Sequence, residues 1–335
     1  MNAFDSRIRI ASWLIAAIVL LLIVKLHLLP ALISGLLVYV LVHVLAPKLV
    51  RVVSGTRAKQ VALVLLSTVI IGALIAAGLL LAALFRGDGG GFAALGGKLA
   101  DIIEQARTEL PPWAVQSLPS NADAMKGTIV EWLRTHLGEL QLAGLEAVRS
   151  LAHILLGLII GAIIALRTEL QPPQKGPLAE ALLERAQRLA ESFRQIVFAQ
   201  VRISALNTIF TSIYLAVVLP SFGVDLPLIK TMILVTFVVG LLPVVGNLIS
   251  NTLIVIISLA HSHYVAFASL AYLVIIHKLE YFLNARIVGS RISARAWELL
   301  IAMLAMEAAF GMSGLVAAPI YYAYLKNELR AAAMI

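Results

Sequence analysis

The chain has 335 residues, of which 61% are hydrophobic and only 13% are charged. An ordinary soluble domain has about a quarter charged residues, and a core of this size cannot hide so large an apolar excess from water. The mean hydropathy of +0.97 therefore excludes a soluble enzyme. It predicts an all-α, polytopic membrane protein, because segments of about 20 apolar residues span the bilayer as helices.

The formal net charge of +8 is attributed to cytoplasmic loops beside anionic lipid. We expect no nucleic-acid partner, since no cluster of Arg, Lys and aromatic residues forms a soluble binding module. The sequence contains no cysteine, which excludes disulfides and thiolate metal sites. It also has no nucleotide-binding loop, metalloprotease helix or nucleophile motif. We therefore expect no enzyme activity, no cofactor and no metal.

The N-terminal half is predicted to hold four spans in three regions. Residues 1–85 contain three spans, and the first follows Arg7 and Arg9 without a cleavage site, which places the N-terminus in the cytoplasm. Residues 86–149 form a polar insert with weakly amphipathic helical patterns. Residues 150–202 contain the fourth span and then an amphipathic helix expected at the inner membrane face. The four predicted spans are Ile10–Val24, Leu28–Ala46, Val61–Phe85 and Ser150–Leu166.

Residues 203–335 form the predicted transport region, with spans at Ile203–Leu219 and Tyr264–His277 and two unusually long apolar segments. The long segments, Leu228–Ala260 and Trp297–Leu325, would be about 50 Å and 43 Å long as straight helices, which exceeds the hydrocarbon thickness. Each is broken near its middle by residues that bend or interrupt a helix. The breaks contain Pro243 and Gly246 in the first segment, and Gly311, Gly314 and the later Pro319 in the second.

The two long segments are interpreted as re-entrant hairpins, which leaves about six full spans and both termini in the cytoplasm. This topology places more of the 26 basic residues on the inner side than the alternative of eight single crossings does. Paired broken segments that enter the membrane from opposite sides indicate an inverted-repeat transporter with a site near the midplane.

Several polar residues inside the apolar segments are candidates for a substrate or ion pathway. Glu307 is the strongest candidate, because no other charge lies near it in its segment. A carboxylate in a membrane can exchange a proton or bind a cation. Its alternative is a protonated carboxyl bonded to a neighbouring helix. Glu280 and Asn284 are compatible with a relay at the inner mouth or with an interfacial ion-pair network.

Asn247 and Asn251 directly follow the first break, where unwound backbone frees groups that bind ions or polar solutes. The alternative is hydrogen bonding between helices, which is common in membranes.

The C-terminal third resembles a known family in three motifs. These are Leu242-Pro-Val-Val-Gly-Asn247, the stretch HKLEYFLNARIVGSRI at 277–292, and AAFGMSGLVAAPIYYAYLKNEL at 308–329. Together they are similar to the autoinducer-2 exporter family of bacterial inner-membrane transporters, whose layout of spans and insert also fits. The chain resembles a divergent member, because Ala285 and Ala296 stand where the family often has Pro. Glu307 is not part of the resemblance.

The resemblance implies a homo-oligomer, expected as a pentamer, in the bacterial inner membrane. It also implies a secondary transporter that exports a small polar solute such as autoinducer-2, or exchanges sodium for protons. A non-transporting membrane scaffold or assembly protein, which binds partners through the insert, is the alternative from another class. A passive channel is the third.

Overall fold

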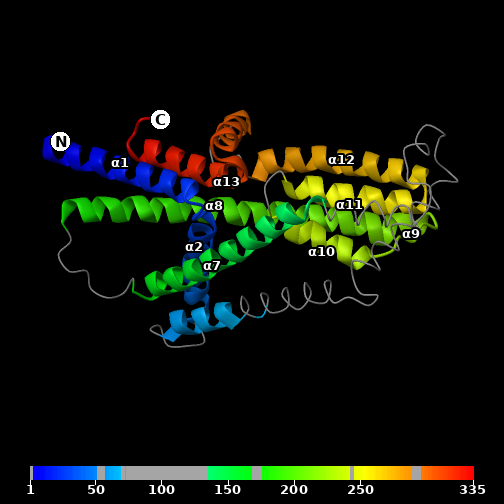
Figure 1. Ribbon diagram of the computed structural model, residues 1–335, viewed down its shortest axis with the longest axis horizontal. Helices are drawn as coiled ribbons and strands as arrows, with labels where there is room; N and C mark the ends of the chain where they lie inside the picture. The colour runs from blue at the N-terminus through cyan, green and yellow to red at the C-terminus, as the bar shows by residue number, and fades with distance from the viewer. Residues whose placement is uncertain are drawn as a thin grey trace. The chain divides into compact units, whose positions relative to one another are not determined.

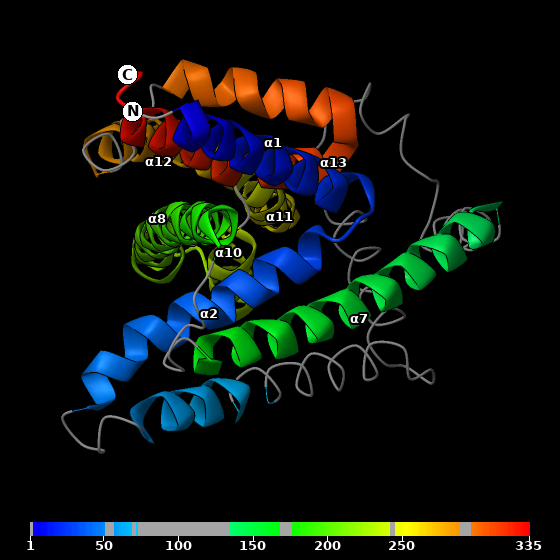
Figure 2. The same ribbon diagram turned by 90° about the vertical axis from the view of Figure 1, so that its left-hand side faces the viewer.

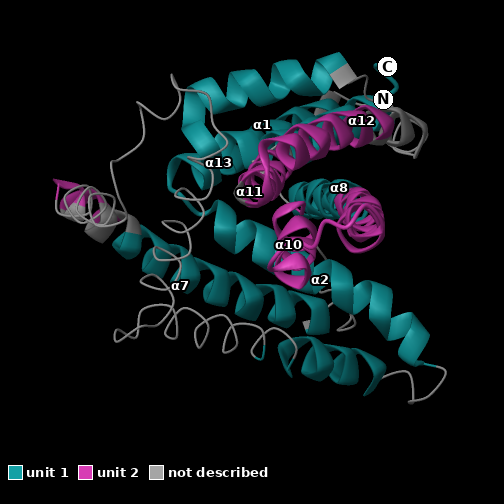
Figure 3. Cartoon of the chain, turned by 90° about the vertical axis from the view of Figure 1, so that its right-hand side faces the viewer, with its two compact units in different colours: residues 1–73, 143–198, 289–335 teal, residues 74–142, 199–288 magenta. Residues whose placement is uncertain are grey.

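The computed structural model describes residues 3–50, 57–68, 72, 135–167, 176–241, 245–287 and 296–335. All regular structure in these ranges is helical, which confirms the predicted fold class. Within them, five helices are long and apolar enough to cross a membrane, and three further helices are apolar but shorter. The chain divides into two compact units, which Figure 3 shows in different colours. The first comprises Met1–Ala73, Ala143–Phe198 and Gly289–Ile335, and the second comprises Leu74–Leu142 and Ala199–Val288.

The first unit is built from α1, α2, most of α7, the beginning of α8, and α13 (Figure 1). Its core joins helices far apart in sequence, since Val40 of α2, Phe193 of α8 and Ile320 of α13 are buried in one cluster. The bounds of these helices are α1 Ala3–Lys25, α2 Leu29–Leu49, α7 Leu137–Arg167, α8 Pro177–Ile213 and α13 Ala296–Ala331.

Glycines allow α2 and α7 to pack with their backbones in contact (Figure 2). A Cβ atom added to Gly157 would lie 2.2 Å from the carbonyl oxygen of Ala31, and one added to Gly161 would lie 2.2 Å from that of Gly35. The Ser34 hydroxyl also donates to the carbonyl of Ile154 at 3.0 Å. Gly157 and Gly161 form a GxxxG pair, the spacing that lets membrane helices approach closely. Here the pair joins two helices of one chain.

The predicted amphipathic helix and the predicted span at Ile203–Leu219 are joined in a single helix, α8. Its 37 residues give a length of about 55 Å at about 1.5 Å per residue. The polar beginning of α8 is therefore a direct continuation of the apolar part. A π-helix, η1 (Tyr214–Val218), and the short α9 (Leu219–Ser221) complete this helical run. Such π-helical turns are rare in proteins, and those that occur are often found at functional sites.

The second unit places the end of α8 beside α10 (Ile229–Val239), α11 (Val245–His261) and α12 (His263–Ile287) (Figure 1). The first long apolar segment folds back on itself, because α10 and α11 pack against each other. Met232 of α10 and Ile254 of α11 lie in one buried cluster, as an antiparallel pair requires. A Cβ on Gly246 would lie 2.2 Å from the carbonyl oxygen of Val239, so the two helices meet closely at the break.

The second long apolar segment, α13, also folds back. Gly311 has φ 61° and ψ −144°, a backbone conformation that only glycine adopts without strain. A Cβ on Gly314 would lie 1.9 Å from the carbonyl oxygen of Met306, whereas a straight helix would separate these residues by about 12 Å. Glu298, near the start of α13, contacts Tyr322 and Lys326, near its end. Gly311 lies about midway between Glu298 and these two partners, as expected for the turn of a hairpin. Both long segments are therefore helical hairpins.

Candidate functional site

The end of α8 presents a row of polar side chains to the α10–α11 hairpin within the second unit. Gln200, Ser204, Asn207 and Thr211 have the spacing of one helical face. The last carbonyls of α10 have no partner within their own helix, and lipid offers none. The Ser204 hydroxyl donates to the Phe237 carbonyl at 2.6 Å, and the Gln200 amide donates to the Gly240 carbonyl at 2.8 Å. Side chains of α8 thus satisfy backbone that the break exposes.

Asn247 is placed by this packing against α8. The Asn207 side-chain amide donates to the Asn247 side-chain oxygen at 3.1 Å, and Asn207 is only 4% exposed. The sequence leaves two interpretations of Asn247 open, the binding of an ion or polar solute and hydrogen bonding between helices. The described contact is a hydrogen bond between helices, to an asparagine on α8, while Ser250 is buried and its hydroxyl lies 3.4 Å from the Asn247 carbonyl.

Thr211 has a buried hydroxyl that finds no hydrogen-bond partner among the residues that the structure describes. The threonine is 1% exposed and follows Asn207 by one turn. Other hydroxyls of α8 bond the backbone one turn earlier, as Thr208 does to the Ser204 carbonyl at 2.7 Å. The hydroxyl of Thr211 does not, so it is available to a water, an ion or a solute.

Three more hydroxyls continue this polar face toward α12. The Tyr214 and Ser269 hydroxyls lie 2.9 Å apart, and Ser269 lies 2.8 Å from Ser258. The Tyr214 ring stacks on Tyr272 with centroids 4.1 Å apart. We call the whole set the polar track: Ser204, Asn207, Thr211, Tyr214, Asn247, Ser250, Ser258 and Ser269. In the described part of the second unit, the buried polar side chains are all uncharged hydroxyls and amides.

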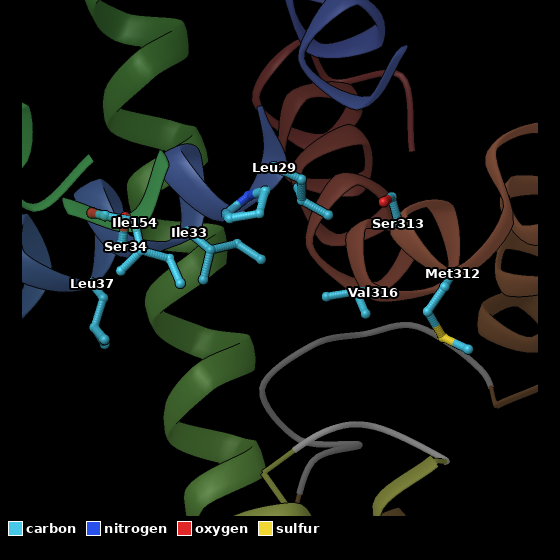
Figure 4. Close-up of a pocket in the computed structure, with 9 residues that line it drawn as sticks. Leu29, Ile33, Ser34, Leu37, Ile154, Met312, Ser313 and Val316 are labelled. Carbon is cyan, nitrogen blue, oxygen red and sulfur yellow. The ribbon is translucent and has the colours of Figure 1, made fainter. Parts of the chain in front are cut away.

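A separate pocket adjoins the break of α13 in the first unit (Figure 4). Its volume is about 450 Å³ and its wall is almost entirely apolar. Side chains of α2 and α7 form one side, and residues that follow Gly311 form the other. The lining residues are Leu29, Pro30, Ile33, Ser34 and Leu37 of α2, Ile154 of α7, and Met312, Ser313 and Val316 of α13.

An ion cluster fixes the last turns of α13 in the same unit. Glu328, 5% exposed, accepts hydrogen bonds through Oε2 from Arg185, from Arg188 at 2.8 Å and from the Trp13 indole at 3.1 Å. Next to it, the Asn327 amide donates to the Ser192 hydroxyl at 2.8 Å. The end of α13 is thereby tied to α1 and α8.

The predicted pathway residues are divided between the two units. Gly246, Asn247 and Asn251 lie at the start of α11, whereas Gly311, Gly314 and Pro319 lie in α13. Glu307 is exposed on the first half of α13. Pro243 lies outside the described residues. Glu280 and Asn284 belong to α12, and their side chains lie outside the described part.

Sequence reasoning missed the α8 contribution to the polar track and the ion cluster. The signal for the first was present, since polar residues recur at helical spacing through an apolar span. The pairing of Glu328 with Trp13 and two arginines gave no sequence signal, because these residues come from three distant segments.

Comparison with known proteins gives one family. The model of the AI-2E family transporters matches residues 10–334, nearly the whole chain. A comparison with curated proteins gives no match.

Proposed function

Because this chain belongs to the AI-2E family of transporters, we propose that it is a secondary transporter that exports a small, uncharged polar solute. It is a multi-pass membrane protein of a transporter family rather than of an enzyme family. We place it in the bacterial inner membrane with both termini in the cytoplasm, as a homo-oligomer. Autoinducer-2 is the first solute to test.

The observation that carries the proposal is the polar track with the Thr211 hydroxyl, which has no partner among the described residues. Burying a polar group away from water without a partner is costly, and more so inside a bilayer. The buried Thr211 hydroxyl lies between Asn207 and Tyr214 in the sequence of the polar track. Its lack of a described partner is explained if a passing solute forms a hydrogen bond with it. Since the buried polar side chains in the described part of the second unit are uncharged, they suit the hydroxyl and carbonyl groups of a neutral solute.

The exchange of sodium for protons is the second candidate. It is favoured by Glu307, a carboxylate in an apolar helix that is exposed rather than paired within the core. Exchange needs a group that binds and releases protons, and the eight described residues of the polar track include no carboxylate, imidazole or amine.

The test is flux into proteoliposomes, with autoinducer-2, sodium and protons measured side by side. Thr211→Val keeps the shape of the side chain and removes its hydroxyl, so folding stability should hold or rise. We expect solute flux to fall about fivefold, the effect of one lost hydrogen bond of about 1 kcal/mol. Thr208→Val is the matched control, because the Thr208 hydroxyl bonds only backbone of its own helix.

Three outcomes would contradict the proposal. Equal flux in Thr211→Val and the parent protein would remove the polar track from the pathway. A purified protein that moves none of the three solutes, and that co-purifies with a stoichiometric partner, would indicate the scaffold alternative. Flux that does not saturate and needs no driving ion would indicate a channel.

A further inference from the structure

The two halves of α13 are attached very differently. We call residues 296–310 the first limb and residues 312–331 the second limb. The second limb is in the core of the first unit, with Ala317 at 0% and Ala323 at 2% exposure. The first limb exposes Trp297, Leu300 and Leu304 at 56%, 55% and 67%. One limb is therefore a structural element of the unit, and the other lies along its outside.

Polar contacts anchor the second limb to other helices. Glu328 is bonded by Arg185, Arg188 and Trp13, as described above. The Tyr321 hydroxyl donates to the Leu20 carbonyl of α1 at 3.0 Å. Moving this limb would break a buried ion cluster, which is costly.

The first limb is fastened to the second at its beginning. Glu298 accepts a hydrogen bond from the Tyr322 hydroxyl at 2.7 Å and lies 2.7 Å from the Lys326 ammonium. We call this three-residue contact the latch. Exposed and partly exposed ion pairs contribute little to stability, so the latch can open at low cost compared with the Glu328 cluster.

The side chains on the inner face of the first limb form an apolar contact that can adapt when the limb moves. Its inner face presents Met303, which is buried, and Met306 and Phe310, which pack against a cluster with Val24 and Leu29. Methionine side chains are flexible and adapt to shifted neighbours. The limb ends at Gly311, whose positive φ gives a hinge that other residues would resist.

The hinge adjoins the apolar pocket. Met312 and Ser313 directly follow Gly311 and line the pocket with Leu29. Leu29 also belongs to the cluster on which Met306 and Phe310 pack. The first limb does not itself line the pocket, but it packs behind pocket residues, because Ile33 and Val316 belong to the same cluster. A rotation of the first limb about Gly311 would therefore remove the packing that supports this part of the pocket wall.

We propose that the first limb is a lid that swings on Gly311, that the Glu298–Tyr322–Lys326 latch holds it closed, and that Glu298 is a positioning residue for transport. The second limb stays fixed during this motion. The role of the lid in transport rests on the proposed function, whereas the opening of the pocket does not.

The first experiment measures the opening without any transported solute. The chain has no native cysteine, so Ser313→Cys gives a single thiol in the pocket wall of the full-length protein in lipid vesicles. Its rate of reaction with a maleimide is compared in the parent background and in Glu298→Gln. We expect about a tenfold faster rate in Glu298→Gln. The exchanged pair Glu298→Lys with Lys326→Glu should restore the parent rate.

The control is Glu191→Gln, which removes an exposed carboxylate paired with Arg194 on α8 and should leave the rate unchanged. An unchanged Ser313→Cys rate in a folded Glu298→Gln protein would overturn the lid. If that variant fails to fold, Tyr322→Phe replaces it, and the same comparison decides.

The second experiment locks the lid during flux. A short reducible crosslinker joins cysteines at Glu298 and Lys326, and a second protein carries the same link between Ser192 and Asn327, which holds the second limb to α8. We expect the first link to stop flux until reductant is added and the second to leave flux unchanged. Full flux with the first link in place would overturn the role of the lid in transport. If Glu298→Gln speeds thiol labelling but the protein moves no solute, the result would support the lid and reject the proposed function.

Discussion

Glu328 shows how much one buried carboxylate can organise in this protein. It joins α13 to α8 through two arginines and to α1 through Trp13. Glu328→Gln would leave the buried Arg185, which is 6% exposed, with only the half-exposed Glu184 as a counter-charge. We expect a loss of about 3–5 kcal/mol of stability, measured by thermal unfolding in detergent. Glu191→Gln should cost less than about 1 kcal/mol, because its ion pair is exposed. Equal effects of the two would show that the cluster contributes nothing beyond surface charge.

Glu307 provides a second test at the level of a single residue. The side chain is exposed, so Glu307→Gln should change stability by no more than about 0.5 kcal/mol. If Glu307 exchanges protons during transport, this variant loses the pH-dependent part of the flux while the protein remains folded. The measurement is proteoliposome flux over a series of external pH values. A pH profile that matches the parent would remove Glu307 from the mechanism.

The polar residues were only partly predictable from the sequence. Asn247 was predictable because it stands directly after a Pro/Gly break, a local signal. Its partner Asn207 lies in a different helix, and nothing near Asn207 in the sequence indicates which helix it faces. Thr211 and Thr208 also look equivalent in sequence. Only packing shows that the Thr208 hydroxyl bonds its own helix and that the Thr211 hydroxyl finds no partner in the described part of the chain.

At the scale of elements, glycine packing between α2 and α7 has an effect that can be measured. Gly161→Ala would place a methyl group against the Gly35 carbonyl, and the resulting overpacking should cost about 1–3 kcal/mol. Gly144 lies in the same helix with nothing within 4 Å of an added Cβ. Gly144→Ala should therefore stabilise the protein by about 0.5–1 kcal/mol through helix propensity. Thermal unfolding that shifts in the same direction for both variants would contradict this packing.

The elements themselves were predictable where one local cause dominates. The two long segments exceed one bilayer thickness and carry Gly or Pro at their middles, and both are hairpins in the structure. The continuity of α8 was not anticipated, because the change from polar to apolar composition near residue 200 suggested a boundary. Composition sets where a helix meets lipid, whereas residues such as Pro or Gly favour its end, and none occurs between Gln200 and Ile213.

For the whole molecule, the hairpins decide the membrane topology. With the N-terminus inside, a hairpin at α10–α11 returns the chain to the outer side, whereas a single crossing would bring it to the inner side. Ser221 precedes this hairpin, and His261 ends it. The hairpin topology therefore places both residues outside, and it leaves the tail near Ala332 inside.

The test uses single cysteines at these three positions in intact cells, since the parent protein contains none. A maleimide that cannot cross the membrane should label Ser221→Cys and His261→Cys at similar rates. Ala332→Cys should react only after the cells are permeabilised.

Labelling of Ser221→Cys without His261→Cys would show that α10 and α11 together cross the membrane once. In that case the close contact of Gly246 with Val239 would have to open in the membrane, at the loss of the hydrogen bonds from Gln200 and Ser204. Because lipid cannot replace these bonds, we expect the hairpin to persist and the two outer positions to react together.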